Sequence, residues 1–519
     1  MKLWAFVIAA AALLVVGSAT PGTRAEVRTR VVIAMTAEAC SANPVALEPG
    51  ATAFVVRNRT RRPRLFTIAG RRTSYIRPRR SRTLRVELTR TGIYRYFCIS
   101  NGPRRAVRTG AVGVRLRPAP LPPPPEHPIA VRLSGGAGEF YDRRTGARFV
   151  PRGNNYLRRA NQQLPDGRIV FRGSTFIAGL YDPGGMEAAL ETMHADGYNA
   201  VRVILDDACR RGCLGNFGTG GLSPTYLDNV TDFLRRAKAN DIYVMLTNEG
   251  NVPAGTTWEA IVHQECCAVF AGTNLYYLTT GGITGTQQFW QAFLRGLLMR
   301  RAPLDIVLGY SLVNEGYFES DKSPLAQTSG TVTTANGRTY DLGNPADRQR
   351  MMDENLVNFA DHVRTAIREV DPTALVAMGF FWPQSPNPAR GGDPRLIRTG
   401  PVIHDSALDY VDLHLYPGLE LSFQEYTENF ELTRLTAKPI VLGEYGAFKF
   451  SSPTASGAAS NLVDWQQESC SYGFDGWLLW TWDTTDEAPG EAELWTAVDE
   501  GGVIEHALAP AARPDPCGH

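Results

Sequence analysis

Residues 306–318, which read IVLGYSLVNEGYF, are the stretch that decides the fold. The apolar residues up to Val313 form a short run bounded by turn residues, as expected for a strand that is buried on both faces. The polarity then changes abruptly at Asn314 and Glu315. A barrel of parallel strands builds its active site at the carboxyl ends of the strands. The stretch therefore predicts a barrel strand that delivers a glutamate to such a site.

A second stretch, residues 439–446 with the sequence PIVLGEYG, repeats the pattern and contains Glu444. A single glutamate after an apolar run is more often a loop residue than a functional one. The pair is stronger evidence, because Glu315 and Glu444 both follow apolar strands and both precede Gly or Tyr-Gly. Two carboxyl groups at strand ends are the minimum that hydrolysis of a glycosidic bond requires.

The chain of 519 residues is long enough for a large barrel and a small additional domain. Residues 1–25 contain a lysine, the apolar run 3–16 and then small residues, which predicts a secretory signal peptide. A membrane anchor is the alternative, but the run is short for a membrane span. We therefore expect an exported protein, extracellular or periplasmic, with no membrane span in the mature chain.

Eight cysteines in an exported chain favour disulfide bonds, and a zinc site is less favoured because no two CxxC pairs occur. We expect the pairs Cys40–Cys98 and Cys470–Cys517, although the sequence leaves the connectivity open. The other four are expected to form a local cluster; they are Cys209, Cys213, Cys266 and Cys267.

Charge divides the chain into two parts. The net charge is only +2, yet residues 24–117 hold 22 arginines, no lysine and four glutamates, so the remainder is clearly acidic. This split indicates two domains with different surfaces. We expect the arginine-rich domain, residues 26–117, to bind an anionic cell-envelope or glycan surface. The alternative is that it docks on the acidic domain and stabilises it. Nucleic acid is not expected as a partner of an exported protein.

The arginine-rich domain has the pattern of a small β-sandwich, with short apolar or alternating stretches between Gly, Pro and Asn. Its last strands resemble the end of a cupredoxin, in which the strand carries a cysteine copper ligand, here Cys98. A blue-copper site also needs two histidines, and residues 27–117 contain none. We therefore expect a cupredoxin-like fold without a copper site, and no metal or cofactor.

Residues 118–128 are rich in proline and predict an extended linker. From residue 129 to residue 519, predicted strands alternate with predicted helices. Repeated strand–helix units imply a parallel sheet, and eight of them predict an α/β fold of the (β/α)8 TIM-barrel class. The strands are expected at residues 149–156, 200–205, 242–247, 306–313, 375–380, 411–415, 440–442 and 476–482.

The motifs at these strand ends resemble glycoside hydrolase family 5, the cellulase-like branch of clan A, over most of the chain beyond the linker. Asn314 and Glu315 match the asparagine and the acid/base glutamate of its fourth strand, and Glu444 matches its nucleophile. The resemblance implies a retaining O-glycosyl hydrolase, cellulase- or mannanase-like, that cleaves β-linked poly- or oligosaccharides by double displacement. It implies no cofactor.

The same resemblance assigns polar residues that bind the substrate or support the nucleophile. Arg202 matches the arginine of the second strand, and its permanent charge would keep Glu444 ionised. His414 and Tyr416 match a histidine and a tyrosine of the sixth strand; the alternative for His414 is a core histidine with satisfied hydrogen bonds. Tyr416 would donate a hydrogen bond to the nucleophile, and Asn314 would bind the sugar 2-hydroxyl.

Aromatic residues complete the predicted site, because their flat faces stack on sugar rings. Trp480 matches the sugar-stacking tryptophan of the eighth strand, and Tyr156 and Trp382 are further candidates. Trp482 is expected in the core or behind the site. One departure concerns the position after the third strand, where family members often carry a histidine and residues 245–249 read MLTNE. This departure leaves the identity of the sugar open.

The main alternative to an enzyme is a non-catalytic cell-surface protein that binds glycans on a decayed hydrolase barrel. Intact Glu315 and Glu444, with Arg202 and Asn314 predicted beside them, favour an enzyme. A copper redox protein is disfavoured by the lack of histidine in the arginine-rich domain. Endo or exo action is not evident from the sequence.

Overall fold

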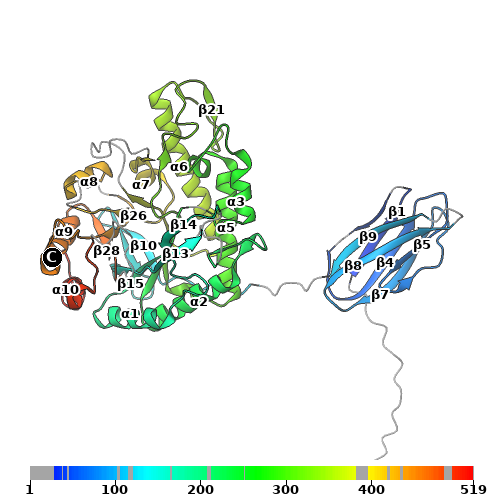
Figure 1. Cartoon of the computed structure of the whole chain (residues 1–519), viewed down its shortest axis with the longest axis horizontal. Coiled ribbons are helices and arrows are strands. Elements are labelled where there is room, and N and C mark those ends of the chain that lie inside the picture. The colour runs from blue at the N-terminus through cyan, green and yellow to red at the C-terminus, as the bar shows by residue number, and fades with distance from the viewer. Residues whose placement is uncertain are drawn as a thin grey trace, which may run out of the picture. The chain divides into compact units, whose positions relative to one another are not determined.

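The computed structural model describes residues 29–37, 39–43, 46–101, 106–114, 121–163, 166–206, 212–250, 252–381, 395–417, 421–432, 436–483 and 494–517. They form two compact units that divide between Pro120 and Leu121 (Figure 1). The predicted signal peptide, residues 1–25, lies outside the described residues. Within the described ranges, no helix has the length and apolar character that crossing a membrane requires.

The N-terminal unit consists of two β-sheets that face one another. One sheet contains, in spatial order, β2 (Cys40–Asn43), β1 (Thr29–Met35), β4 (Gly50–Asn58) and β7 (Ser81–Leu88). The other contains β3 (Ala46–Leu47), β9 (Val107–Val114), β8 (Gly92–Ser100), β5 (Arg64–Ile68) and β6 (Arg71–Arg72). Buried side chains from both sheets form one core, as in a β-sandwich. The disulfide Cys40–Cys98 joins β2 to β8 and confirms the predicted pair.

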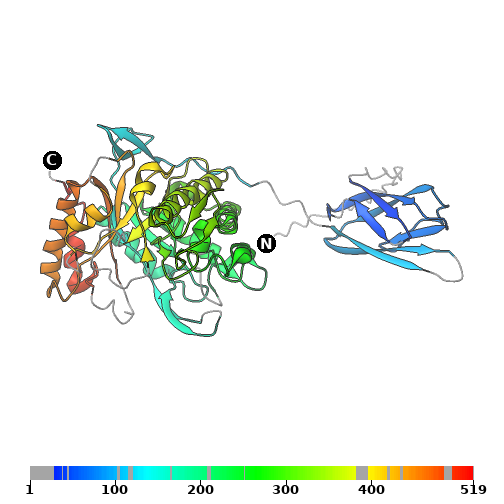
Figure 2. The same cartoon turned by 90° about the horizontal axis from the view of Figure 1, so that it is seen from above.

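The C-terminal unit is a barrel of parallel strands with helices around it (Figures 1 and 2). Around the barrel lie β12 (Arg152–Asn155), β15 (Ala200–Leu205), β18 (Tyr243–Asn248), β19 (Val307–Ser311), β23 (Val376–Ala377), β24 (Gly379–Phe381), β26 (Val411–His414), β27 (Ile440–Tyr445) and β28 (Phe474–Leu479). β23 and β24 are two parts of one strand, separated only by Met378: β23 pairs with β19 and β24 pairs with β26. Since β28 also pairs with β12, the ring closes with eight strand positions, which confirms the predicted (β/α)8 fold.

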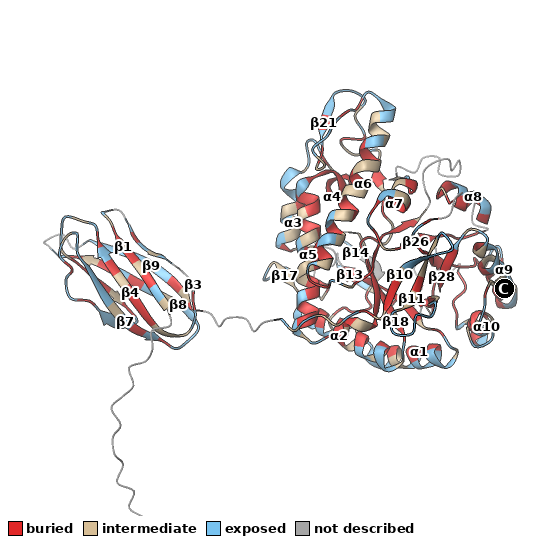
Figure 3. Ribbon diagram, turned by 180° about the vertical axis from the view of Figure 1, so that it is seen from behind, coloured by how far each residue is buried: buried red, intermediate tan, exposed pale blue. Residues whose placement is uncertain are grey.

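The surrounding helices carry apolar faces that cover the strands, which are buried (Figure 3). In α2, Tyr226, Val230 and Phe233 recur at helical spacing and are buried, and Ser223 caps the helix by accepting a hydrogen bond from the backbone N of Tyr226. The helices are α1 (Pro183–Ala195), α2 (Pro224–Ala239), α3 (Thr257–Val262), α4 (Asn274–Leu278), α5 (Thr280–Met299), α6 (Pro345–Arg368), α7 (Gly400–Asp405), α8 (Phe423–Asn429), α9 (Ala455–Cys470) and α10 (Asp499–Leu508).

A hairpin fills one end of the barrel. β10 (Ile129–Ser134) pairs with β11 (Ala137–Asp142), and the Phe140 ring packs edge-on against Tyr410, with 5.3 Å between the ring centroids. Both residues belong to a buried cluster with residues from the barrel strands. His127, in the predicted linker, is buried as well, and its Nε2 lies 2.9 Å from Asp371 Oδ2. The barrel unit therefore begins before the end of the proline-rich segment.

Further disulfides lie in the barrel unit. Cys470–Cys517 ties the last residue of α9 to the C-terminal segment, which confirms the second predicted pair. Cys266 and Cys267 are bonded to each other. Cys213 is also disulfide-bonded, and Cys209 lies outside the described residues.

Phe140→Ala should lower the free energy of unfolding by about 3–5 kcal/mol, because it removes a ring from the packed base of the barrel. Urea denaturation followed by tryptophan fluorescence measures the loss. Leu133→Ala is the matched control, because Leu133 lies on the same hairpin and is 64% exposed. The control should change the stability by less than about 0.5 kcal/mol. Equal losses in the two variants would contradict the role of the hairpin.

Candidate active site

The predicted polar residues meet at the carboxyl end of the barrel. Arg202 lies in β15, His414 ends β26 and Glu444 lies in β27, while Asn314 and Glu315 follow β19. Arg202, His414 and Glu444 are buried, whereas the side chain of Glu315 is 28% exposed. Residues that are up to 242 positions apart in the chain are therefore in hydrogen-bond contact.

Arg202 is at the centre of this cluster. Its guanidinium is fully buried and donates to side-chain oxygens from four other segments. These acceptors are Glu444 Oε1 at 2.7 Å, Asn155 Oδ1 at 2.9 Å, Asn314 Oδ1 at 2.5 Å and Asp412 Oδ2 at 3.2 Å. A buried ion is tolerated only when charged partners and hydrogen bonds compensate its lost hydration. The position of Arg202 therefore holds all four acceptors in place.

Asn155 and Asp412 are site residues that the sequence analysis does not single out. Asn155 ends β12, and its Nδ2 donates to the backbone oxygen of Gly443 at 2.8 Å. Asp412 precedes His414 by two positions in β26, so the two side chains lie on the same face of the strand. The available signal was a polar residue inside an otherwise apolar strand, which must find a partner when it is buried.

Gly443 lies against the Asp412 side chain, where the register of β26 and β27 shifts, and a larger residue would not fit there. A Cβ atom on Gly443 would lie 1.6 Å from Asp412 Oδ1, which is closer than any non-bonded contact. The carboxylate of Asp412 is fully buried, and its Oδ1 lies 3.4 Å from His414 Nε2. Gly443 therefore makes room for a carboxylate that contacts both Arg202 and His414.

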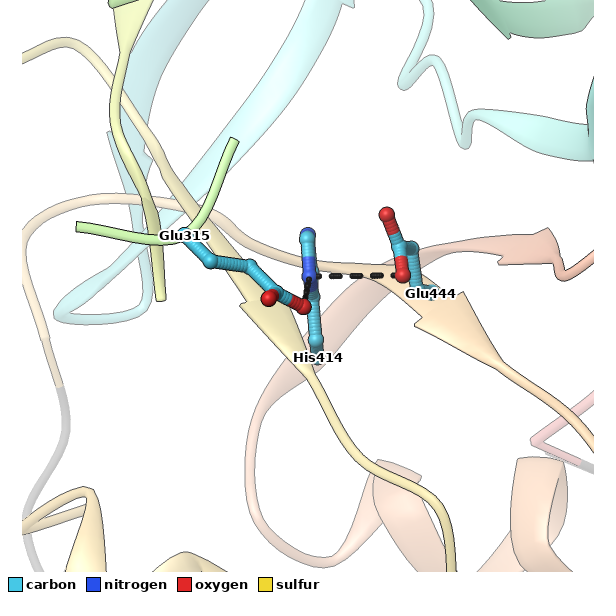
Figure 4. A group of neighbouring side chains, drawn as sticks. All are labelled: Glu315, His414 and Glu444. Atoms are coloured by element: carbon cyan, nitrogen blue, oxygen red, sulfur yellow. Dashed lines mark hydrogen bonds and ion pairs between the residues drawn. The ribbon is translucent and has the colours of Figure 1, made fainter. Parts of the chain in front are cut away.

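His414 lies between the two glutamates (Figure 4). Its Nδ1 is 3.0 Å from Glu315 Oε1 and 3.5 Å from Glu444 Oε2. Burial alone would lower the pKa of His414, but the charges of Glu444 and Asp412 raise it to about 9. At this pKa the ring is protonated at neutral pH. Its Nδ1 then faces the two glutamates, whereas its Nε2 lies 3.4 Å from Asp412 Oδ1 and 3.2 Å from Arg202 Nη2.

Glu444 is held through both of its oxygens. Arg202 binds Oε1, and the Tyr416 hydroxyl donates to Oε2 at 2.8 Å. Burial raises the pKa of Glu444, the charges of His414 and Arg202 oppose this, and Glu315 adds to it. An oxygen of Glu315 lies within 4.8 Å of an oxygen of Glu444. The two carboxyl groups are thus close enough to act on the same bond.

The same cluster also has the residue types of a metal-binding site. Glu315, His414 and Glu444 each offer one ligand atom, and these atoms lie within 4.8 Å of one another. A histidine binds a metal only through an unprotonated nitrogen. The raised pKa of His414 therefore opposes metal binding at neutral pH.

The predicted tryptophans differ in position. Trp480 is 9% exposed and belongs to a cluster with Tyr416 and Phe448, beside Glu444. Trp482 is buried in the main core, where the sequence analysis expects it. Trp382 lies outside the described residues.

Tyr156 is not brought to the site with the others. Its ring packs against Phe233 of α2, with 6.3 Å between the centroids, and the guanidinium of Arg158 lies 4.3 Å from its centre. Successive side chains of a strand point to opposite faces. Because Asn155 points into the barrel toward Arg202, Tyr156 points outward into the layer of helices.

Two charged residues near the site, Arg159 and Glu249, are not among the predicted site residues. Arg159, at the start of β13 (Arg159–Gln163), has a pKa that is lowered by burial, while the charges of Glu249 and Glu444 oppose this decrease. Glu249 follows β18, next to the position where the family often carries a histidine. From the sequence alone Glu249 is expected to be structural, because nothing in the sequence shows that an arginine lies near it.

The family model for cellulase (glycosyl hydrolase family 5) matches residues 165–486. The chain belongs to glycosyl hydrolase family 5. Its structure is similar to that of the endo-1,4-beta-mannanase from Rhizomucor miehei, with a TM-score of 0.51 and 15% identity, over 74% of this chain and 99% of that chain. The beta-mannanase from the blue mussel Mytilus edulis is 17% identical over 75% of this chain and 98% of that chain, with a TM-score of 0.43. No curated protein matches this sequence.

Membership of family 5 makes this protein a glycoside hydrolase, and its barrel has the fold of the Rhizomucor enzyme. At 15% identity that likeness shows the fold alone. The evidence for a function of this chain comes instead from the cluster around Arg202.

Asp412→Asn should move the basic limb of the pH profile of kcat/KM to lower pH by about one unit or more, because it removes a buried negative charge that raises the pKa of His414, and the protonated ring orients Glu315 through Nδ1. The profile is measured on an aryl β-glycoside. Asp206→Asn is the matched control: Asp206 is also buried, but it accepts hydrogen bonds from Tyr226 and the backbone of Phe176. The control should leave the limb in place. An unchanged limb in Asp412→Asn would contradict the positioning role of Asp412.

Proposed function

We propose that this family 5 protein is an exported retaining glycosidase that cleaves β-linked poly- or oligosaccharides by double displacement. The observation that carries the proposal is the separation of Glu315 and Glu444, whose nearest oxygens lie within 4.8 Å. Retaining glycosidases hold their carboxyl groups about 5–5.5 Å apart, whereas inverting enzymes leave about 6.5–9.5 Å to admit a water molecule. The close pair favours retention.

Glu444 is assigned as the nucleophile. One of its oxygens attacks the anomeric carbon, the glycosidic C–O bond breaks, and a covalent glycosyl ester forms. Arg202 and Tyr416 hold the carboxylate through separate oxygens, at 2.7 and 2.8 Å, so it needs little rearrangement to attack. Their hydrogen bonds to the ionised form support the nucleophile role.

Glu315 is assigned as the acid/base. It is the more exposed of the two glutamates, so the leaving group and water can reach it. In the first step it gives its proton to the glycosidic oxygen. In the second step it takes a proton from the water that attacks the anomeric carbon, and Glu444 is released as a carboxylate. The ring of His414, with its Nδ1 3.0 Å from Glu315 Oε1, orients this carboxyl group.

Asn314 and Trp480 are assigned to substrate binding. The Oδ1 of Asn314 accepts from Arg202, so the amide NH₂ group is the part that would donate to the sugar 2-hydroxyl. That contact strengthens in the oxocarbenium-like transition state. Trp480 lies in the cluster beside Glu444 and would stack on a sugar ring.

Export is part of the proposal. It is supported by the signal-like residues 1–25 and by disulfides such as Cys40–Cys98 and Cys470–Cys517, since disulfides persist in oxidising compartments. The name of the Rhizomucor enzyme makes β-1,4-mannan the first polysaccharide to test, with β-glucan and β-galactan beside it.

Glu315→Gln and Glu444→Gln should each lower kcat/KM on the best β-glycan of such a panel by about 10³-fold or more, because each removes a group that takes part in bond cleavage. Both variants should keep the wild-type circular dichroism, and Glu191→Gln, an exposed glutamate on α1, should keep full activity. NMR of the first product should show retention at the anomeric carbon. Near-normal activity in either variant, or inversion at the anomeric carbon, would contradict the roles assigned to Glu315 and Glu444. A non-catalytic glycan-binding protein would turn over no substrate.

The two glutamates should differ in how their loss is rescued. Glu444→Gly with azide should yield an α-configured glycosyl azide from an activated β-glycoside, because azide then attacks once from the face that the carboxylate has left. Glu315→Ala should keep activity only on substrates with very good leaving groups, and azide should then yield the β-glycosyl azide from the glycosyl-enzyme. Exchange of these two behaviours would reverse the assignment of acid/base and nucleophile. NMR of the azide products distinguishes the cases.

A further inference from the structure

The N-terminal unit contains a hollow of about 340 Å³ at the point where β4 ends and β7 begins. It is lined by Arg57, Asn58, Arg59, Arg79, Arg80 and Ser81. We propose that this hollow, the arginine pocket, binds a carboxylate or sulfate group of an acidic polysaccharide. The choice of a polysaccharide rests on the proposed glycosidase function of the barrel.

The arginine pocket is built on an ordered framework. Arg57 of β4 lies opposite Ser81 of β7, and the backbone N of Asn58 donates to Arg80 O at 2.9 Å. Asn58 is buried, and its Nδ2 donates to the backbone oxygens of Arg62 and Ile76, at 2.8 and 2.9 Å. One buried side chain therefore joins the loop after β4 to the loop before β7. The arginines on these loops converge because the loops are held together.

The charge of this unit is separated along its sheet. Arg57, Arg59, Arg79 and Arg80 are exposed, and none of them forms an ion pair within the described ranges. Glu87 lies opposite Ala51, at the other end of the β4–β7 pair. That pair lies six residue steps along the strand from Arg57 and Ser81, which corresponds to about 20 Å. The pocket therefore keeps its positive charge available for a ligand.

Guanidinium groups have a planar fork of donors that matches carboxylate, sulfate and phosphate oxygens. A hollow of about 340 Å³ is within the usual range for small-ligand sites, so it accommodates one sugar ring with its acidic group. Phosphate head groups of a membrane have similar oxygens, so anionic vesicles are included in the test as the competing ligand. A polysaccharide also suits a chain whose other unit belongs to a glycoside hydrolase family.

Arg79 is a suitable position at which to test the arginine pocket by substitution. Its φ is 58°, in the left-handed region that favours glycine, and the turn is closed by a hydrogen bond from Arg80 N to Arg77 O at 3.2 Å. Arg79→Gly therefore removes a charge from the pocket and relieves backbone strain in the same substitution. We therefore expect this substitution to leave the fold intact, and circular dichroism checks it.

The experiment measures binding of the full chain to immobilised polygalacturonate, dextran sulfate and neutral β-mannan, and to phosphatidylglycerol vesicles, at low and high salt. The pocket variant is Arg57→Gln/Arg79→Gly/Arg80→Gln. The control variant, Arg85→Gln/Arg90→Gln/Arg95→Gln, has the same net charge. Its substitutions lie outside the pocket, farther along β7, after β7 and on β8 of the other sheet.

The pocket variant should bind polygalacturonate or dextran sulfate about tenfold or more weakly than the wild type, because it loses paired charge-assisted hydrogen bonds. The control variant should lose less than about threefold, since isolated surface charges are screened by salt. Preference for the one or the other polymer identifies the acidic group. Equal losses in the two variants, binding to the vesicles alone, or binding to none of the probes would overturn the proposal.

Hydrolysis of an aryl β-glycoside is measured in parallel, so that the two proposals fail separately. The pocket variant should hydrolyse it at the wild-type rate, because Arg57, Arg79 and Arg80 lie in the other unit. Pocket-dependent binding without hydrolysis in any form of the protein would contradict the glycosidase proposal and support the pocket.

Discussion

The buried guanidinium of Arg202 is the constraint on which the rest of the site depends. It is a permanent charge without access to water, so the fold must surround it with acceptors. Those acceptors come from β12, β26, β27 and the segment after β19, and their hydrogen bonds tie these segments together around it. The same contacts that make the charge tolerable also set the position of the proposed nucleophile, Glu444. Stability and catalytic geometry therefore have one cause here.

Charge balance connects this constraint to the proposed chemistry. Arg202 and protonated His414 carry two positive charges, and ionised Asp412 and Glu444 carry two negative ones, so the cluster is neutral while Glu315 keeps its proton. Formation of the glycosyl ester removes the charge of Glu444. The cluster becomes neutral again when Glu315 gives its proton to the leaving group. The new carboxylate then lies 3.0 Å from the positive ring of His414. Each step in the proposed cycle thus avoids an uncompensated buried charge.

Sequence reasoning succeeded for features that repeat and failed where the third dimension was needed. The alternation of apolar strands with amphipathic helices predicts the barrel, and the change of polarity at Asn314 and Glu444 marks strand ends. Asp412 was missed because its importance depends on facing Arg202 across the barrel. Tyr156 was expected in the site, yet the alternation of side chains along β12 turns it toward α2 once Asn155 points inward.

The sequence by itself determined the barrel class and the residue types of the site, because each follows from local pattern, composition or a short motif. The disulfide connectivity stayed open until the structure showed Cys40–Cys98 and Cys470–Cys517. Only the tertiary structure decided which of those residues touch. It placed His414 between two glutamates and gathered four arginines at one end of a sheet. The physical reason is that pKa values and binding pockets depend on distances of a few ångströms between residues far apart in the chain. Sequence spacing does not contain those distances.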